Sequence, residues 1–360
     1  MDQKIRFLTS DDGVRLAYAS SGAGSPLLKT ANWLNDLEFD WHSPVWRHWF
    51  DLFSSHHTLH RYDVRGTGLS DRAEHDLSFD RQVADLEHIA DALHLERFAL
   101  LGISQGASVA IEYAARHPER VSKIVIVCGF VQGWARRGPK DLRRGRALAE
   151  LVRVGWGSSN PVYRRMFAEL ILPEATAEQV EWFAELQHRS ATPDTAARIM
   201  EACGDIDVCH RLSEVRAPTL VFHARRDALV PFEEGRIIAA GIPDSQFIEL
   251  DTPNHIPLEG EPSWQRFCSA TAEFLGWPCP VANVVDTLGE ENMSDLTARE
   301  REILALVAGG SSNGEIAARL HISEKTVRNH LTAVFDKLGV NSRSQAIVFA
   351  RDRGVTGTLN

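Results

Sequence analysis

Over its first 270 residues the chain alternates short β-rich runs with segments of helical periodicity. The runs at 57–63 (HTLHRYD), 98–104 (FALLGIS) and 121–130 (VSKIVIVCGF) are rich in β-branched and aromatic residues, whereas residues 79–95 space their apolar side chains as a helix does. Such alternation restricts the choice of fold, because parallel strands need a crossover connection, usually a helix. We therefore expect an α/β fold, with a mostly parallel sheet and helices on both faces.

The alternation is interrupted once and ends before the chain does. Residues 131–212 are helical in pattern and rich in Arg, Glu and Ala, so we expect a helical cap inserted into a first domain of residues 1–276. Residues 277–293 contain two prolines and no clear periodicity, which is typical of a linker. Residues 294–360 return to helical patterns and are expected to form a second, small all-α domain.

Charge is distributed unevenly between these two domains. The whole chain carries a net charge of −10, yet residues 294–360 hold 9 Lys and Arg against 7 Asp and Glu, and the remainder holds 30 against 42. The acidic body argues against nucleic acid as its partner, whereas the C-terminal part is open to one. With 44% hydrophobic residues the chain has ordinary globular composition, which excludes global disorder.

Several features bear on where the chain works. No apolar run approaches the roughly 18 residues of a membrane span, and the first ten residues lack the apolar core of a secretory signal. The five cysteines include no CxxC pair, so we expect free thiols in a reducing compartment rather than disulfide bridges or zinc. These patterns predict a cytoplasmic protein without a membrane partner, a metal site or a cofactor.

A serine lies in a tight turn between a predicted strand and a predicted helix. The sequence Gly102-Ile103-Ser104-Gln105-Gly106 joins FALLGIS to GASVAIEYAARH. A turn this tight forces the central residue into a strained conformation, and glycines on both sides remove the side chains that would clash. Ser104 would then project its hydroxyl above the carboxyl end of the sheet.

A serine hydroxyl needs a base and an orienting acid to become a nucleophile. In a strand–serine–helix architecture the acid and the histidine follow in that order, and Asp227 and His255 both come just after predicted strands. Carboxyl ends of parallel strands form one edge of the sheet, which brings Ser104 and both residues to the same rim. Two structural alternatives remain: Asp227 as a helix cap and His255 as a hydrogen-bonded loop residue.

With these motifs, residues 1–276 resemble the α/β-hydrolase superfamily, and residues 63–70 (DVRGTGLS) are similar to that family's D-x-R-G-x-G-x-S turn. The resemblance implies an α/β-hydrolase sheet with a cap. It also implies Ser104 as the nucleophile, His255 as general base and acid, and Asp227 as the orienting carboxylate.

The same resemblance implies an oxyanion hole. The backbone N–H of Gln105 would supply one donor. In the family the second donor usually follows a His-Gly pair after the third strand, but residues 29–34 read KTANWL. We therefore expect the second donor from Asn32 or Trp33, and the departure puts efficient acyl transfer in question, because one lost donor costs about 10²–10³ in rate.

In the C-terminal segment, capping residues indicate where the helices begin. Thr297-x-x-Glu300 and Ser312-x-x-Glu315 match the capping box, and Ser323 can cap the next helix. In that next helix an apolar stripe must pack inward: Val327, Leu331, Val334 and Leu338.

The opposite face of this helix carries basic and polar side chains, namely Lys325, Arg328, Asn329, Thr332 and Lys337. Two helices joined by a short turn, the second with such a face, describe a helix-turn-helix. Arg and Asn side chains suit base edges, and Lys suits phosphates. The alternative from periodicity alone is a small helical dimerisation domain with a solvated face.

The amino-acid sequence of the segment resembles the LuxR-type helix-turn-helix family at residues 296–300, 315–317, 322–323, 326–330, 337–340 and 343. The resemblance implies that Arg328, Asn329 and Thr332 face the DNA groove. It implies that Lys325, Thr326 and Lys337 lie nearer the phosphates. One departure is Ala333, where family members commonly have Asn.

These observations favour a DNA-binding transcription regulator whose hydrolase-like domain senses, and slowly hydrolyses or merely binds, a small ligand. The expected partners are double-stranded DNA, a small molecule and a second copy of the chain in a homodimer. The alternative is an active serine hydrolase of a small ester, lactone or amide with an accessory DNA-binding module. A third hypothesis is an interaction scaffold with two inactive sites.

Overall fold

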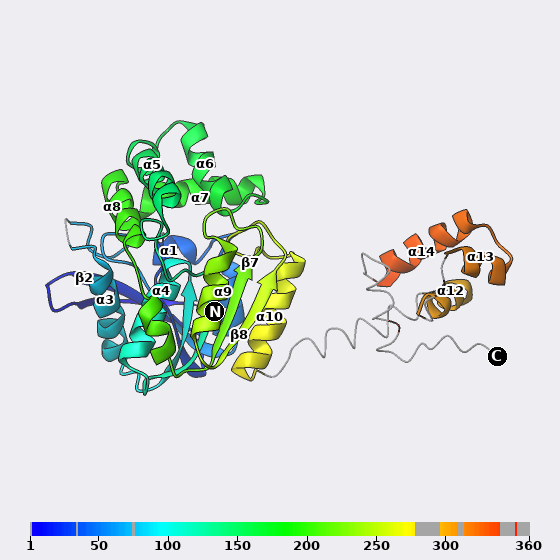
Figure 1. Ribbon diagram of the computed structural model, residues 1–360, viewed down its shortest axis with the longest axis horizontal. Coiled ribbons are helices and arrows are strands. Elements are labelled where there is room, and N and C mark those ends of the chain that lie inside the picture. Colours follow the sequence, from blue (N-terminus) through cyan, green and yellow to red (C-terminus); the bar gives the residue numbers. More distant parts are fainter. Residues whose placement is uncertain are drawn as a thin grey trace. The chain divides into compact units, whose positions relative to one another are not determined.

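The structure is a computed structural model that describes residues 2–33, 35–73, 76–277, 296–308, 311, 313–338 and 350 (Figure 1). These residues belong to two compact units, 1–277 and 278–360. No described helix is long and apolar enough to cross a membrane. The expected linker lies outside the described residues except for Trp277, whose indole N–H donates to His57 Nε2 over 2.7 Å, so that this tryptophan is part of the first unit.

Within the described residues of the first unit, eight strands form one sheet in the order β1-β2-β4-β3-β5-β6-β7-β8. The first two pairings, β1 with β2 and β2 with β4, are antiparallel, and all others are parallel. The strands are β1 (Lys4–Thr9), β2 (Arg15–Ser21), β3 (Ser25–Lys29), β4 (His57–Tyr62), β5 (Phe98–Ile103), β6 (Val121–Val127), β7 (Thr219–Ala224) and β8 (Ser245–Leu250). The expected α/β fold is confirmed.

Helices cover both faces of the sheet because strand side chains alternate between them. On β5, Phe98 and Leu100 belong to one buried cluster, whereas Leu101 and Ile103 belong to another. The first cluster includes residues of α3 (Phe79–Ala92), α4 (Gln105–Arg116) and α9 (Phe232–Gly241); the second includes residues of α2 (Arg47–Ser54) and α10 (Pro262–Leu275). A short helix, α1 (Leu37–Asp40), was not foreseen; the Asp36 side chain caps it.

The expected cap region is helical, and Figure 1 shows it beyond one end of the sheet. It consists of α5 (Pro139–Gly155), α6 (Pro161–Ile171), α7 (Ala177–Ser190) and α8 (Pro193–Gly204), followed by a 3₁₀ turn at Cys209–Glu214. Proline begins α5, α6 and α8, where its missing N–H is harmless, and a complete capping box of Thr176 and Gln179 begins α7. Its own aromatic packing includes Trp156 against Phe167, with ring centroids 5.6 Å apart.

The second unit contains α12 (Ala298–Ala308), α13 (Asn313–Leu320) and α14 (Glu324–Leu338). Thr297 and Glu300 form the predicted reciprocal cap of α12, and the Ser323 hydroxyl accepts the N–H of Thr326 over 3.1 Å. The apolar stripe predicted for α14 is buried, as expected for the face that packs inward: Val327, Leu331, Val334 and Leu338.

Candidate active site

Ser104 follows β5 and precedes α4 in a strained turn. Its φ of 54° lies in the left-handed region, which costs a residue other than glycine about 1–3 kcal/mol. The neighbouring glycines are required by space: a Cβ on Gly102 would lie 2.7 Å from the Cα of Ala107, and one on Gly106 would lie 2.5 Å from the hydroxyl of Thr30. The local sequence therefore holds Ser104 where the parallel strands end, as the G-x-S-x-G pattern predicts.

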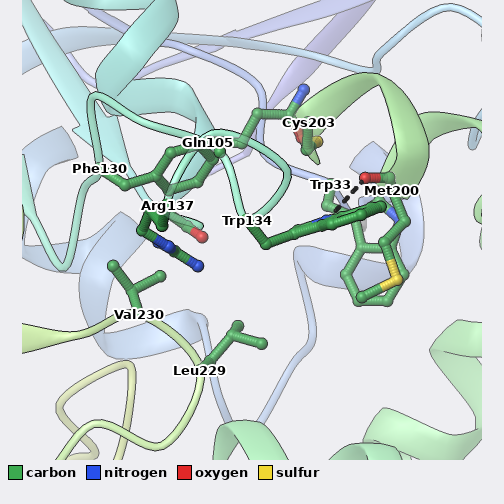
Figure 2. A pocket seen from close by; sticks show the side chains of 11 residues that line it. Trp33, Gln105, Phe130, Trp134, Arg137, Met200, Cys203, Leu229 and Val230 are labelled. Atoms are coloured by element: carbon green, nitrogen blue, oxygen red, sulfur yellow. Dashed lines mark hydrogen bonds between the residues drawn. The ribbon is translucent and has the colours of Figure 1, made fainter. Parts of the chain in front are cut away.

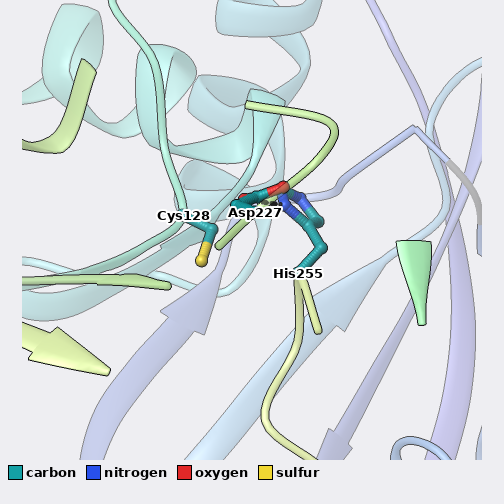
Figure 3. Close-up of side chains that lie close together, drawn as sticks. All are labelled: Cys128, Asp227 and His255. Atoms are coloured by element: carbon teal, nitrogen blue, oxygen red, sulfur yellow. Dashed lines mark hydrogen bonds and ion pairs between the residues drawn. The ribbon is translucent and has the colours of Figure 1, made fainter. Parts of the chain in front are cut away.

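Asp227 and His255 meet at the same edge of the sheet (Figure 3). The aspartate follows β7 and the histidine follows β8, and Asp227 Oδ2 lies 2.6 Å from His255 Nδ1. The other carboxylate oxygen accepts the backbone N–H groups of Leu229 and Val230, over 2.8 and 3.1 Å. The carboxylate is thus fixed on both oxygens, and it holds the imidazole with Nδ1 as the donor.

The electrostatics of this pair keep the acid ionised. Burial alone would raise the pKa of Asp227, but the adjacent His255, its hydrogen bond and the Val230 N–H outweigh burial and lower that pKa. The other ring nitrogen of His255, Nε2, is buried and has no hydrogen-bond partner among the described residues. Ser104 and His255 line the same cavity without a hydrogen bond between them, and such bonds in ligand-free sites are often long.

Two further residues lie close to the Asp227 carboxylate, and the sequence did not indicate them. Cys128, directly after β6, is fully buried and has its sulfur, a carboxylate oxygen of Asp227 and a ring nitrogen of His255 within 4.8 Å of one another (Figure 3). His223 on β7 has Nε2 3.9 Å from Asp227 Oδ2. Only the general rule that strand ends share one edge could have pointed to them.

The Cys128, Asp227 and His255 side chains could in principle ligate a metal ion, but their chemistry here does not fit one. Burial, followed by the nearby Asp227 charge, raises the pKa of the Cys128 thiol well above its ordinary value, so the thiolate that a metal needs is disfavoured. Both carboxylate oxygens are already used by Nδ1 and by two backbone N–H groups.

The candidate oxyanion-hole residues lie around Ser104. Gln105 is the first residue of α4, so its backbone N–H has no partner within the helix. Asn32 and Trp33 follow β3 and line a cavity together with Ser104 and His255. The buried Lys29 ammonium donates to the Asn32 side chain, and burial lowers the pKa of Lys29 to about 7.

The cavity at Ser104 has two lobes, which share Trp33, Ser104 and Leu229. The first, which we call the Trp134 lobe, measures about 490 Å³. Figure 2 shows its other principal lining residues: Gln105, Phe130, Trp134, Arg137, Met200, Cys203 and Val230.

The second, which we call the Trp46 lobe, measures about 420 Å³ and is lined on the cap side by Ile171, Phe183 and Leu186. Both volumes include space that is open to solvent, and the two lobes meet at Trp33, Ser104 and Leu229.

The cap is hydrogen-bonded to the loops that carry the acid and the histidine. Arg144 of α5 donates to the carbonyl of Ala228 over 2.7 Å, and the backbone N–H of His255 donates to the carbonyl of Ile171 at the end of α6 over 2.8 Å. The residue before the histidine, Asn254, accepts the N–H of Glu174 over 3.0 Å. A ligand that moves α5 or α6 would therefore also move residues next to Asp227 and His255.

In the second unit, the side chains of Arg328, Asn329 and Thr332 lie outside the described part, although their backbone belongs to α14. Lys325 is exposed at the start of the same helix, beside Thr326. The Lys337 ammonium donates to both Glu300 oxygens, over 3.0 and 2.8 Å. Since an ammonium has three donors, this ion pair leaves Lys337 one for a DNA phosphate.

Family models match two parts of the chain. The model for the alpha/beta hydrolase fold matches residues 37–262, and the model for bacterial regulatory proteins of the luxR family matches residues 294–350. The two matches fall in different units of the structure.

The known proteins reported next are each similar to one of these two parts of the chain. "Putative carbamate hydrolase RutD" of Azorhizobium caulinodans is 30% identical over 250 residues, which are 67% of this chain and 88% of the relative. "Probable transcriptional regulatory protein SgaR" of Hyphomicrobium methylovorum is 49% identical over 63 residues, which are 18% of this chain and 30% of the relative. The crystal structure of a hydrolase from Pseudomonas aeruginosa superimposes with a TM-score of 0.64 at 23% identity, over 76% of this chain and 98% of that one, and thus shares the fold. The chain belongs to the α/β-hydrolase family and carries a LuxR-type DNA-binding domain at residues 294–350.

Proposed function

We propose that this protein is a transcription regulator that binds DNA through its second unit and senses a small ligand in the cavity at Ser104. One observation carries the proposal: a LuxR-type DNA-binding domain shares a chain with a hydrolase-fold domain whose cavity lies under a cap. Because a DNA-binding regulator acts on the chromosome, we place it in the cytoplasm.

The hydrogen bonds between cap and loops support ligand sensing. Through Arg144 and the His255 N–H, the positions of α5 and α6 are coupled to the two loops below them. A ligand that contacts both the cap and Ser104 would favour one arrangement of the cap. It would change DNA binding to the extent that its affinity differs between the two arrangements.

For DNA recognition we propose that α14 enters the major groove. Arg328, Asn329 and Thr332 would contact base edges, with Lys325, Thr326 and Lys337 nearer the phosphates. We further propose a homodimer on two half-sites about one helical turn apart, which is the usual arrangement of dimeric helix-turn-helix proteins.

The experiment is a selection of binding sites from random DNA with the full chain, followed by affinity measurements on the selected site. Arg328→Ala should lose about 1–3 kcal/mol at one base position if it contacts a base. Arg301→Ala is the matched control, because Arg301 is an exposed arginine on α12. No enrichment of any sequence, or equal losses in both variants at every base position, would contradict the proposal.

A second candidate function, hydrolysis of a small ester, lactone or amide at Ser104, is favoured by the strained Ser104 backbone and the Asp227–His255 hydrogen bond. The relative named as a carbamate hydrolase is consistent with such chemistry. Labelling of Ser104 by a fluorophosphonate, measured by intact mass and absent from Ser104→Ala, is the test. If folded, DNA-binding protein is not labelled, the domain acts by binding alone.

A further inference from the structure

Arg137 is the one charged side chain among the described residues that line the Trp134 lobe. It lies in the loop before α5, so it belongs to the cap. In Figure 2 its guanidinium points into the space between Trp134, Leu229 and Val230. Only 14% of this side chain is exposed, and the carboxylates whose charges act on it most strongly are those of Glu234 and Asp141.

The hydrogen bonds of Arg137 leave part of its guanidinium unused. Nη1 donates to the carbonyl of Gln132 over 3.3 Å, whereas the buried Nε has no hydrogen-bond partner among the described residues. The carboxylate of Asp141 is 3.6 Å from Nε, beyond a good hydrogen bond. By contrast, the buried Arg65 donates to two carboxylates, Asp12 and Asp85, over distances down to 2.6 Å.

The rest of the lobe is mostly apolar. Trp33, Phe130, Trp134, Met200, Leu229 and Val230 surround the space between Ser104 and Arg137. Such a lining favours an aromatic or branched hydrocarbon body, and Arg137 adds one fixed site for an anion. A carboxylate matches a guanidinium in shape and charge, and the lobe supplies no second cation of the kind a phosphate dianion would call for.

We propose that the Trp134 lobe binds a small carboxylic acid with an aromatic or branched apolar body, whose carboxylate pairs with Arg137. The part of the ligand remote from its carboxylate then lies toward Ser104. This inference rests on the proposed function, because it names the chemical class of the ligand in the same cavity. Since Arg137 belongs to the cap, the ion pair would also join the ligand directly to the part of the domain that we propose moves.

The test compares the binding of an acid with that of the alcohol of the same carbon skeleton. A serine hydrolase can cleave neither compound. The probes are 3-phenylpropanoate and 3-phenylpropan-1-ol, with 4-methylpentanoate and 4-methylpentan-1-ol as the branched pair. Binding to the full chain is measured by calorimetry and by quenching of the tryptophans in the lobe. At least one acid should bind about tenfold or more tightly than its alcohol, as expected for a hydrogen-bonded ion pair in a buried site.

Variants test whether Arg137 causes this preference for the acid over the alcohol. Arg137→Gln should abolish the difference between acid and alcohol and leave the affinity for the alcohol unchanged, whereas Arg137→Lys should retain part of it. Arg136→Gln is the matched control, because the neighbouring Arg136 is 53% exposed and the substitution removes the same charge. The control should keep the preference.

Four results would overturn the inference: equal binding of acid and alcohol, equal losses in the two glutamine variants, no saturable binding of either acid, or tighter binding of 3-phenylpropyl phosphate than of 3-phenylpropanoate. The affinity for the selected DNA site is measured on the same samples. If the acid binds through Arg137 but DNA affinity does not respond, the inference stands and the sensing proposal fails. If DNA binding is intact and no acid is preferred, only the inference fails.

Discussion

The replacement Asp227→Asn tests the arrangement at Ser104 most sharply. In the protein, Oδ1 of Asp227 accepts two backbone N–H groups, while Oδ2 receives the Nδ1–H of His255. The new amide would keep its oxygen on the two backbone donors, because an NH₂ group facing them would leave three donors without an acceptor. Its NH₂ group would therefore face His255.

This orientation determines the size of the effect. An NH₂ donor facing Nδ1 requires that nitrogen to accept, which moves the ring proton of neutral His255 to Nε2. The imidazole can then no longer take a proton from Ser104. The loss should be about 10⁴ in rate, as for the equivalent change in a serine protease, or about 5.5 kcal/mol of transition-state stabilisation.

The assay is the second-order rate constant for fluorophosphonate labelling of the full chain, read by intact mass. Asp251→Asn is the control, because Asp251 follows β8, its side chain is 86% exposed and the change in charge is the same. The control should react at the wild-type rate. If Asp227→Asn, folded as judged by circular dichroism, reacts within about tenfold of wild type, His255 does not depend on Asp227 and the reasoning is wrong.

Three further predictions concern stability and ionisation. Arg65→Met should lower the free energy of unfolding of the first unit, measured in urea, by about 3–5 kcal/mol, because it leaves the buried Asp85 carboxylate unpaired. The double variant with Asp85→Leu should recover most of this loss. No recovery would show that Asp85 is not the cause. A Cβ at Gly106 would lie 2.5 Å from a threonine hydroxyl, so Gly106→Ala should destabilise the fold by about 1–3 kcal/mol and slow labelling of the serine; a variant as stable and reactive as wild type would contradict this. Hydrogen bonding by Lys337 lowers the pKa of Glu300 to about 2 from an ordinary 4.5, so the second unit should lose stability as the pH falls between these values. In Lys337→Met the Glu300 carboxyl, followed by NMR, should titrate nearer 4.5. An unchanged titration would assign the lowered pKa to another cause.

The local sequence was sufficient to predict the Ser104 turn. Glycines flank a serine between a strand and a helix, and the atoms that forbid a Cβ at Gly106 belong to the neighbouring β3 loop. The positions of Asp227 and His255 followed from chain order and from the rule that parallel strands end at one edge. Their 2.6 Å contact is a property of the assembled sheet.

Residues whose importance depends on tertiary packing were not predictable in this way. Cys128 follows a strand with no motif around it, and only the pairing of β6 with β7 brings it beside the acid. Arg137 resembles any other arginine in a helical, arginine-rich stretch until the cap encloses it. The contact of Lys337 with Glu300 joins α14 to another helix, α12, which helical periodicity alone cannot reveal.

The central claim is that a ligand in the cavity at Ser104 changes DNA binding by the second unit. The most direct measurement is the affinity of the full chain for its selected DNA site, by fluorescence anisotropy, with the cavity empty and with it filled by 3-phenylpropanoate or by a phosphonyl group on Ser104. The account predicts that filling the cavity changes this affinity by about 5–150-fold, and that saturating DNA changes the affinity for the acid by the same factor. An unchanged DNA affinity, with the cavity shown to be filled by either occupant, would contradict it.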